Sequence, residues 1–116
     1  MVWETVEFDL KSGRPAMRTL QSGYYQPPVD PTSVAAHWRA QGYSCHTMTD
    51  PAGQEWNDFT HETNEYVTIV EGRLKLILNG EALEAGPGDL IFIPRHVVHS
   101  VRNICDSQTT WMFGYD

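Results

Sequence analysis

The sequence has few basic residues, and one long stretch has none. Lys and Arg together number 8 against 15 Asp and Glu in 116 residues, a formal net charge of -7. Binding to nucleic-acid phosphates or to anionic lipid depends on a basic surface, so we expect neither nucleic-acid nor membrane partners. The stretch between Arg39 and Arg73 lacks Lys and Arg but holds six carboxylates: Asp50, Glu55, Asp58, Glu62, Glu65 and Glu71. Such a stretch is either a solvated acidic surface or the surroundings of a bound cation.

Long apolar runs, a targeting segment and paired cysteines are also missing. No apolar run approaches the roughly 20 residues of a membrane helix, and the first residues have neither the basic nor the apolar part of a signal peptide. We therefore expect a cytoplasmic protein. The two cysteines, Cys45 and Cys105, do not form a C-x-x-C pair, so free thiols are expected rather than a zinc knuckle or a disulfide. The length suits a single domain.

The first third of the chain has an irregular pattern. Alternation over residues 2–8 predicts a strand, and residues 11–31, rich in Gly, Pro and Ser, predict an extended wrapping segment. Asp30 followed by Pro31 predicts the start of a short helix, because Asp caps free N–H groups and Pro suits the first helical position. Gly42 predicts its end.

From residue 43 onward the pattern predicts β-strands separated by tight turns. The Asn79-Gly80 pair is a strong hairpin signal. Many short strands joined by Gly, Pro and Asn turns predict an all-β sandwich or small barrel. We therefore divide one domain into residues 1–42, a strand, wrapping segment and short helix, and residues 43–116, the barrel on which they pack. The predicted barrel strands span residues 43–49, 65–71, 73–78, 81–85, 90–93, 97–103 and 109–115.

Histidine and glutamate residues gather in two short segments of the predicted barrel. Side chains an even number of residues apart share one face of a strand, so Phe59, His61 and Glu65 point the same way if no bulge intervenes. His99 lies in the second segment, and facing strands would bring His61, Glu65 and His99 together. Two imidazoles and a carboxylate suit a divalent transition metal with open positions for water or substrate. Spacing alone does not decide between such a site and ordinary surface or hydrogen-bonded residues.

The first segment belongs to a longer spaced pattern. It runs Gly53, five residues, Phe59, one residue, His61, three residues, Glu65, six residues and Gly72. This spacing resembles the first cupin motif, in which a further histidine usually stands where this chain has Phe59.

The second segment follows another pattern of the same family. Gly88, five residues, Pro94, one residue, His96, two residues, His99, three residues and Asn103 resembles the second cupin motif, in which glycine usually stands in place of His96. Both motifs occur in order, which is more specific than either alone. The resemblance to the small single-domain cupins, of the cupin 2-like kind, implies a double-stranded β-helix, or jelly-roll barrel. That all-β fold, with one short N-terminal helix, agrees with the strand pattern.

The resemblance implies that His61, Glu65 and His99 are metal ligands. Because Phe59 cannot ligate, the implied site has two histidines and one carboxylate, the ligand set of the facial triad in non-haem iron oxygenases. The expected cofactor is a divalent transition metal, with iron, manganese, nickel and zinc all open. The alternative is a metal-free pocket in which the same three side chains orient an organic ligand by hydrogen bonds.

Other residues are candidates for an additional ligand or for the pocket. His46 could take the ligand position that Phe59 leaves open, or could face solvent. His96 lies in a turn near the predicted barrel mouth, where it could contact a substrate or face solvent. Trp56 could line an apolar pocket with Phe59, or both could belong to the plain core, and the same two interpretations hold for Trp111, Phe113 and Tyr66.

The sequence leaves the activity open. The resemblance admits a metal-dependent enzyme that acts on a small molecule by dioxygenation, isomerisation or decarboxylation, and equally a barrel that binds or senses a small molecule. We expect a homodimer formed by strand exchange, as in many small cupins.

Among the six carboxylates we expect Glu65 to point inward, and the others to form the rim and outer face: Asp50, Glu55, Asp58, Glu62 and Glu71.

Overall fold

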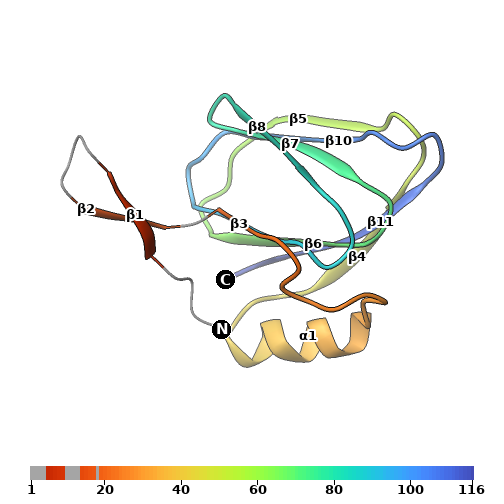
Figure 1. Ribbon diagram of the computed structural model, residues 1–116, viewed down its shortest axis with the longest axis horizontal. Helices are drawn as coiled ribbons and strands as arrows, with labels where there is room; N and C mark the ends of the chain where they lie inside the picture. Colours follow the sequence, from red (N-terminus) through yellow and green to blue (C-terminus); the bar gives the residue numbers. More distant parts are fainter. Residues whose placement is uncertain (1–4, 10–13, 18) are drawn as a thin grey trace.

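Two antiparallel sheets lie face to face and form a barrel (Figure 1). The structure, a computed structural model, describes residues 5–9, 14–17 and 19–116, with side chains from Thr19 onward. In chain order its elements are β1 (Thr5–Asp9), β2 (Arg14–Met17), β3 (Leu20–Gln21), α1 (Pro31–Ala40), β4 (His46–Asp50), β5 (Glu55–Phe59), β6 (Glu65–Glu71), β7 (Leu74–Leu78), β8 (Glu81–Ala85), β9 (Leu90–Ile93), β10 (His99–Asn103) and β11 (Thr109–Tyr115). One sheet has the order β5-β10-β7-β8, the other has the order β3-β9-β6-β11-β4, and β1 pairs with β2.

Strand β6 lies at the centre of the five-stranded sheet and is buried on both faces. Because side chains alternate along a strand, Val67 and Ile69 enter the core between the two sheets, while Tyr66 enters a second cluster on the outer face. A strand buried on both faces reads as a continuous apolar run rather than as an alternating one. Strand β6 has such a run from Tyr66 to Val70, interrupted by Thr68.

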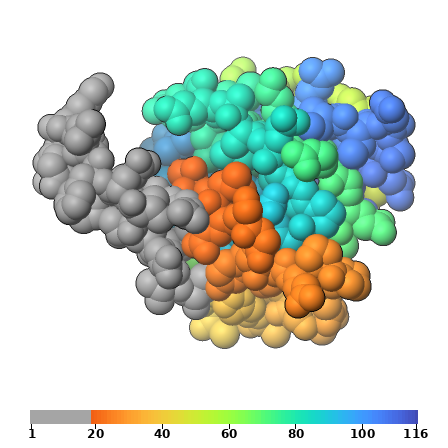
Figure 2. Space-filling model, in the orientation of Figure 1, coloured from red at the N-terminus to blue at the C-terminus, as the bar shows by residue number. Residues whose placement is uncertain are grey.

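Helix α1 covers the outer face of the five-stranded sheet (Figure 1). The Asp30 side chain caps it by accepting a hydrogen bond from the Thr32 N–H at 3.0 Å, and a proline occupies the first turn. Val34 and Trp38 are buried beneath the helix. The Trp38 indole donates to the Tyr25 hydroxyl at 2.9 Å, which joins the helix to the segment before it. That segment, drawn in orange, lies across the strands in the space-filling view (Figure 2).

Most predicted elements are confirmed. The predicted strands over 65–71, 81–85, 90–93 and 109–115 have the bounds of β6, β8, β9 and β11. The hairpin between β7 and β8 turns at Asn79 and Gly80, whose φ angles of 49° and 87° are those of a type I′ turn. The strands predicted over 43–49, 73–78 and 97–103 begin one to three residues later as β4, β7 and β10, and the helix ends two residues before Gly42.

Two parts of the prediction were wrong or incomplete. Strand β5 was not predicted, because its sequence EWNDF lacks apolar alternation and most of its side chains are exposed. The segment predicted as extended over residues 11–31 contains β2 and β3. Of the strand predicted over residues 2–8, residues 2–4 lie outside the described residues and the rest falls in β1.

Smaller expectations have mixed outcomes. Cys45 and Cys105 are free thiols, as expected. Among the residues that the structure describes, no helix has the length and hydrophobicity that a membrane crossing requires. The division into residues 1–42 and 43–116 stays a prediction.

Candidate metal centre

Three separate elements position the side chains of the candidate site. Glu65 is the first residue of β6, His99 is the first residue of β10, and His61 lies in the loop between β5 and β6. The loop backbone is fixed where the His96 N–H donates to the His61 carbonyl at 2.9 Å. Residues 60–64 are not a strand, so the premise that Phe59, His61 and Glu65 share one strand face was wrong.

A second anchor holds the same loop. The Asn64 side-chain oxygen accepts a hydrogen bond from the Arg95 N–H at 2.9 Å. The Asn64 side-chain amide donates to the Asp116 carboxylate, also at 2.9 Å. The loop is therefore tied to the β9–β10 turn and to the last residue, and these ties position His61 without a strand.

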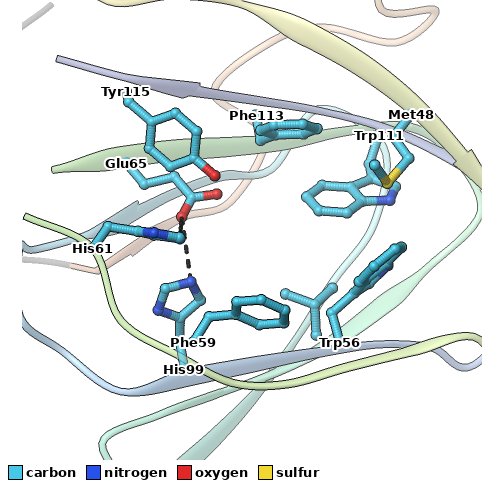
Figure 3. Close-up of a pocket in the computed structure, with 10 residues that line it drawn as sticks. Met48, Trp56, Phe59, His61, Glu65, His99, Trp111, Phe113 and Tyr115 are labelled. Atoms are coloured by element: carbon cyan, nitrogen blue, oxygen red, sulfur yellow. Dashed lines mark ion pairs between the residues drawn. The ribbon is translucent and has the colours of Figure 1, made fainter. Parts of the chain in front are cut away.

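The three side chains converge at one end of a cavity (Figure 3). Glu65 Oε1 lies 3.3 Å from His99 Nε2 and 3.6 Å from His61 Nε2. The three ligand atoms all lie within 4.8 Å of one another. The side chains of Glu65 and His99 are 6% and 5% exposed, whereas that of His61 is 29% exposed. The cluster is thus open on the His61 side and closed on the other.

The hydrogen bond at Nδ1 shows which ring nitrogen of His99 carries the lone pair. Its Nδ1 lies 3.0 Å from the Val97 carbonyl oxygen, which can only accept, so Nδ1 carries a proton. In the neutral ring the Nε2 lone pair then points at Glu65 Oε1, and this buried oxygen accepts no hydrogen bond within the described structure. Two acceptors facing each other at 3.3 Å require a positive charge or a proton between them. The donor set therefore fits a cation, and fixing the Nδ1 proton of a metal-binding histidine through a backbone carbonyl is a common arrangement.

The protonation of His99 reflects the same geometry. Burial by itself would lower the pKa of this imidazole. The Glu65 carboxylate and the Val97 carbonyl oppose that effect and raise the pKa of His99 above its ordinary value. The Glu65 carboxylate thus favours positive charge at His99 Nε2, whether a proton or a metal ion carries that charge.

The cavity beside the three side chains is mostly aromatic. Its volume is about 170 Å³, and its lining residues are Met48, Trp56, Phe59, His61, Glu65, His99, Val101, Trp111, Phe113 and Tyr115. Tyr66 is not among them, because it faces the outer cluster beneath α1. Sequence reasoning missed Tyr115, although alternation along β11 places it on the same face as Trp111 and Phe113. Burial, and then the Glu65 carboxylate, raises the pKa of Tyr115 to about 12, so its phenol is neutral at ordinary pH.

The other histidine candidates lie outside the cluster. His46 is exposed on β4, with its ring 5.3 Å from that of Phe113, and does not reach the position that Phe59 leaves open. The side chain of His96 is 64% exposed, and its Nε2 lies 3.0 Å from the Glu62 carboxylate. Neither histidine lines the cavity.

The expected position of Asp50 within the acidic stretch was wrong. It was expected at the rim or outer face, but it is 3% exposed. Its Oδ2 accepts hydrogen bonds from the indole N–H groups of Trp56 and Trp111, both at 3.0 Å. A buried carboxylate requires such partners, and the sequence does not show them because Trp111 lies 61 residues away.

Asn103, the last residue of the second motif, is buried away from the cavity. Its side-chain amide donates to the carbonyls of Pro51 and Ser107 at 3.0 and 2.9 Å. Its oxygen accepts from the Thr109 hydroxyl at 2.7 Å. Asn103 therefore joins the loops at the closed end of the barrel.

The fold and the two motifs agree with the comparison with known families. A family model for the cupin domain matches residues 46–115, which is more than half of the chain and contains both motifs. The chain belongs to the cupin family. A comparison with curated protein sequences finds no match.

Solved structures of other cupins share this fold. The cupin domain of Cnp3 from Schizosaccharomyces pombe aligns with a TM-score of 0.60 and 16% identity over 63% of this cupin and 54% of that chain. Salicylate 1,2-dioxygenase from Pseudoaminobacter salicylatoxidans, in a structure with gentisate, aligns with a TM-score of 0.59 and 22% identity over 64% of this cupin and 20% of that chain. An RmlC-like cupin from Shewanella frigidimarina aligns with a TM-score of 0.57 and 20% identity over 63% and 64% of the two chains. This cupin spans less than two thirds of each of these chains, and the likeness shows the fold alone.

Proposed function

We propose that this cupin binds a divalent transition metal ion through His61, Glu65 and His99, and that it acts on a small molecule in the adjoining cavity. The observation that supports the proposal is the buried Glu65 oxygen, which accepts no hydrogen bond in the described structure and lies 3.3 Å from His99 Nε2, while the Val97 carbonyl occupies His99 Nδ1. A cation between them would satisfy both groups. Three protein ligands leave coordination positions open for water or substrate.

The residues around the site would then have separate roles. His61, Glu65 and His99 would hold the ion, and a bound ion polarises a ligand oxygen or lowers the pKa of a bound water. The aromatic wall offers water few hydrogen-bond partners in the rest of the cavity. Tyr115 keeps its proton and can donate a hydrogen bond to a ligand oxygen beside Glu65. Such a site supports dioxygenation, isomerisation or decarboxylation, with iron, manganese, nickel or zinc as the ion.

Metal titration tests the ligand assignment. Equilibrium dialysis of the purified protein against Mn²⁺, Fe²⁺, Ni²⁺ and Zn²⁺ should give one ion per chain, and His61→Ala or His99→Ala should abolish binding. His46→Ala is the matched control, because it removes an exposed histidine outside the cluster, and it should bind as the unchanged protein does. Equal affinity in all three variants would overturn the assignment. If the protein binds none of the four ions, the metal-free binding barrel is favoured instead. The presence of Phe59 in place of the usual histidine also favours that alternative.

The open coordination position needs its own measurement. In the Mn²⁺ form, exchange of metal-bound water should increase the relaxation rate of bulk water protons. A small molecule that enters the cavity and displaces that water should reduce the increase. An Mn²⁺ form without exchangeable water would contradict a site for chemistry on a small molecule.

The remaining expectations about partners stay predictions. A homodimer should show twice the chain mass in light scattering at micromolar concentration, and a monomer would contradict it. The cytoplasmic location and the lack of nucleic-acid partners likewise stay predictions.

A further inference from the structure

The cavity has two chemically different ends (Figure 3). His61, Glu65 and His99 form one end, with the Tyr115 hydroxyl beside them. The other end offers almost only carbon, from rings and a thioether: Met48, Trp56, Phe59, Trp111 and Phe113. A ligand that fills the cavity must therefore place different groups at the two ends.

An irregularity in β5 places two of these rings in the cavity. Between the pairs His99↔Phe59 and Val101↔Trp56, the register advances two residues on β10 and three on β5, which marks a β-bulge. Asp58 takes up the extra residue with a φ of 59°. Trp56 and Phe59 are three residues apart and would face opposite ways on a regular strand, yet both line the cavity. Bulges re-aim side chains in this way beside functional sites.

Asp50 determines what the two indoles present to a ligand. Both indole N–H groups donate to Asp50 Oδ2 at 3.0 Å, so Trp56 and Trp111 have no donor left for the cavity. Hydrogen bonding to an anion also shifts electron density from the N–H into the ring. The faces of aromatic rings carry partial negative charge, and the buried Asp50 carboxylate increases it at this end.

The charges around the cavity favour a cation over an anion. None of its ten lining residues is Lys or Arg. The stretch between Arg39 and Arg73 that supplies half of the lining has no basic residue. A negative potential around an opening raises the local concentration of cations and repels anions. An anionic group could therefore be held only at the metal end, and a positive group is favoured among the rings.

We infer that the aromatic end of the cavity binds the methylated ammonium group of a small ligand. Aromatic faces attract such groups, which have no N–H to satisfy. A cavity of about 170 Å³ is slightly larger than the roughly 150 Å³ apolar cavity that holds benzene, so the ligand is a small molecule rather than a lipid or a peptide. With a positive group among the rings and an anionic group at the other end, the ligand is a zwitterion. Its anionic end would meet the metal, and this part of the inference rests on the proposed function.

A pair of probes with one shape and different charge tests the inference. Glycine betaine and 3,3-dimethylbutanoate both carry a carboxylate, but the first has a trimethylammonium group where the second has a tert-butyl group. Calorimetry on the metal-loaded protein should show about tenfold tighter binding of glycine betaine. Equal or tighter binding of 3,3-dimethylbutanoate would overturn the inference in favour of a neutral apolar ligand.

Substitutions locate the preference at the rings. Phe59→Leu keeps an apolar side chain but removes a ring face, and Phe59 is 42% exposed, so the fold should tolerate it. We expect this variant to lower the affinity for glycine betaine about three- to tenfold and to leave that for 3,3-dimethylbutanoate nearly unchanged. Phe92→Leu is the matched control, because Phe92 packs in the outer cluster, and it should change neither affinity. An equal loss for both probes in Phe59→Leu would show that the ring supplies bulk alone, which contradicts the inference.

A metal-free measurement separates this inference from the proposed function. In chelator-treated protein, choline should bind more tightly than its neutral counterpart 3,3-dimethylbutan-1-ol, because neither probe needs the metal. If the protein binds no metal but prefers choline, the metal proposal fails and the assignment of the aromatic end stands. If the protein binds metal but shows no preference within either pair of probes, the metal proposal stands and the inference fails.

Discussion

Glu65 Oε1 and His99 Nε2 lie 3.3 Å apart in the interior of this cupin, and the hydrogen-bonded Val97 carbonyl fixes the His99 proton on the opposite nitrogen. Glu65 begins β6 and His99 begins β10, strands that belong to different sheets. The contact therefore joins the two sheets at the open end of the barrel. This contact stabilises the fold when a cation or a proton lies between the two acceptor atoms.

Metal ions should stabilise the folded protein through this contact. At a free metal concentration 100 times the Kd, binding to the folded state alone adds about 2.7 kcal/mol, which corresponds to a rise in Tm of roughly 10 °C for a domain of this size. Differential scanning fluorimetry with and without a chelator measures the shift. Glu65→Gln should lose it, whereas Glu62→Gln, three residues earlier in the sequence and with a side chain 93% exposed, should keep it. A full shift in Glu65→Gln would contradict the metal site.

Restoring the usual histidine should tighten metal binding. Phe59 pairs with His99 across β5 and β10, and its ring lies in the cavity 6.4 Å from that of His61. Phe59→His would add an imidazole to the two present, and we expect the Kd for Ni²⁺ or Zn²⁺ to fall about tenfold. Phe59→Leu supplies the comparison without a ligand. Equal Kd values for the two variants would show that this position does not reach the ion.

Gly88 should tolerate a side chain less well than Gly53. Both have a positive φ, 86° and 78°, so alanine costs about 1–2 kcal/mol at either position. A Cβ at Gly88 would overlap the carbonyl oxygen of Tyr25, while a Cβ at Gly53 meets nothing within 4 Å. Urea denaturation should therefore show Gly88→Ala to be less stable than Gly53→Ala by about a further 1–3 kcal/mol. Equal losses would mean that the Tyr25 segment moves away freely.

Stability should fall in alkaline solution because of Tyr25. Burial, the largest cause, raises the pKa of its phenol well above the ordinary 10.0, against an opposing effect of the Trp38 hydrogen bond. The unfolded chain ionises near pH 10 while the folded protein keeps this proton. Its contribution is thus complete below pH 10 and is lost as the pH rises toward the folded-state pKa. Urea denaturation between pH 8 and pH 11 measures the loss.

Tyr25→Phe provides the control for that pH dependence. The variant should lose about 1–3 kcal/mol at pH 8, because the Trp38 N–H then lacks the acceptor that lies 2.9 Å away. Its stability should change less between pH 8 and pH 11 than that of the unchanged protein. The same slope in both proteins would assign the alkaline effect to other tyrosines.

The sequence by itself determined the fold family and the elements with strong local signals. Spaced glycines, histidines and Glu65 carried the resemblance to cupins, and Asn79-Gly80 marked its hairpin, because turn geometry depends on neighbouring residues. Strands β6, β8, β9 and β11 were predicted with their bounds, whereas β4, β7 and β10 begin one to three residues later than predicted. The sequence also named the three side chains that the structure brings together, although the reason offered, a shared strand face, was wrong for His61.

Only the tertiary structure decided how the rest of the site is built. The polar sequence of β5 concealed both the strand and the bulge that turns Trp56 and Phe59 into the cavity. Asp50 is buried because indoles 6 and 61 residues away donate to it. Contacts of this kind form between strands that meet only in the folded barrel, so local patterns carry no signal for them.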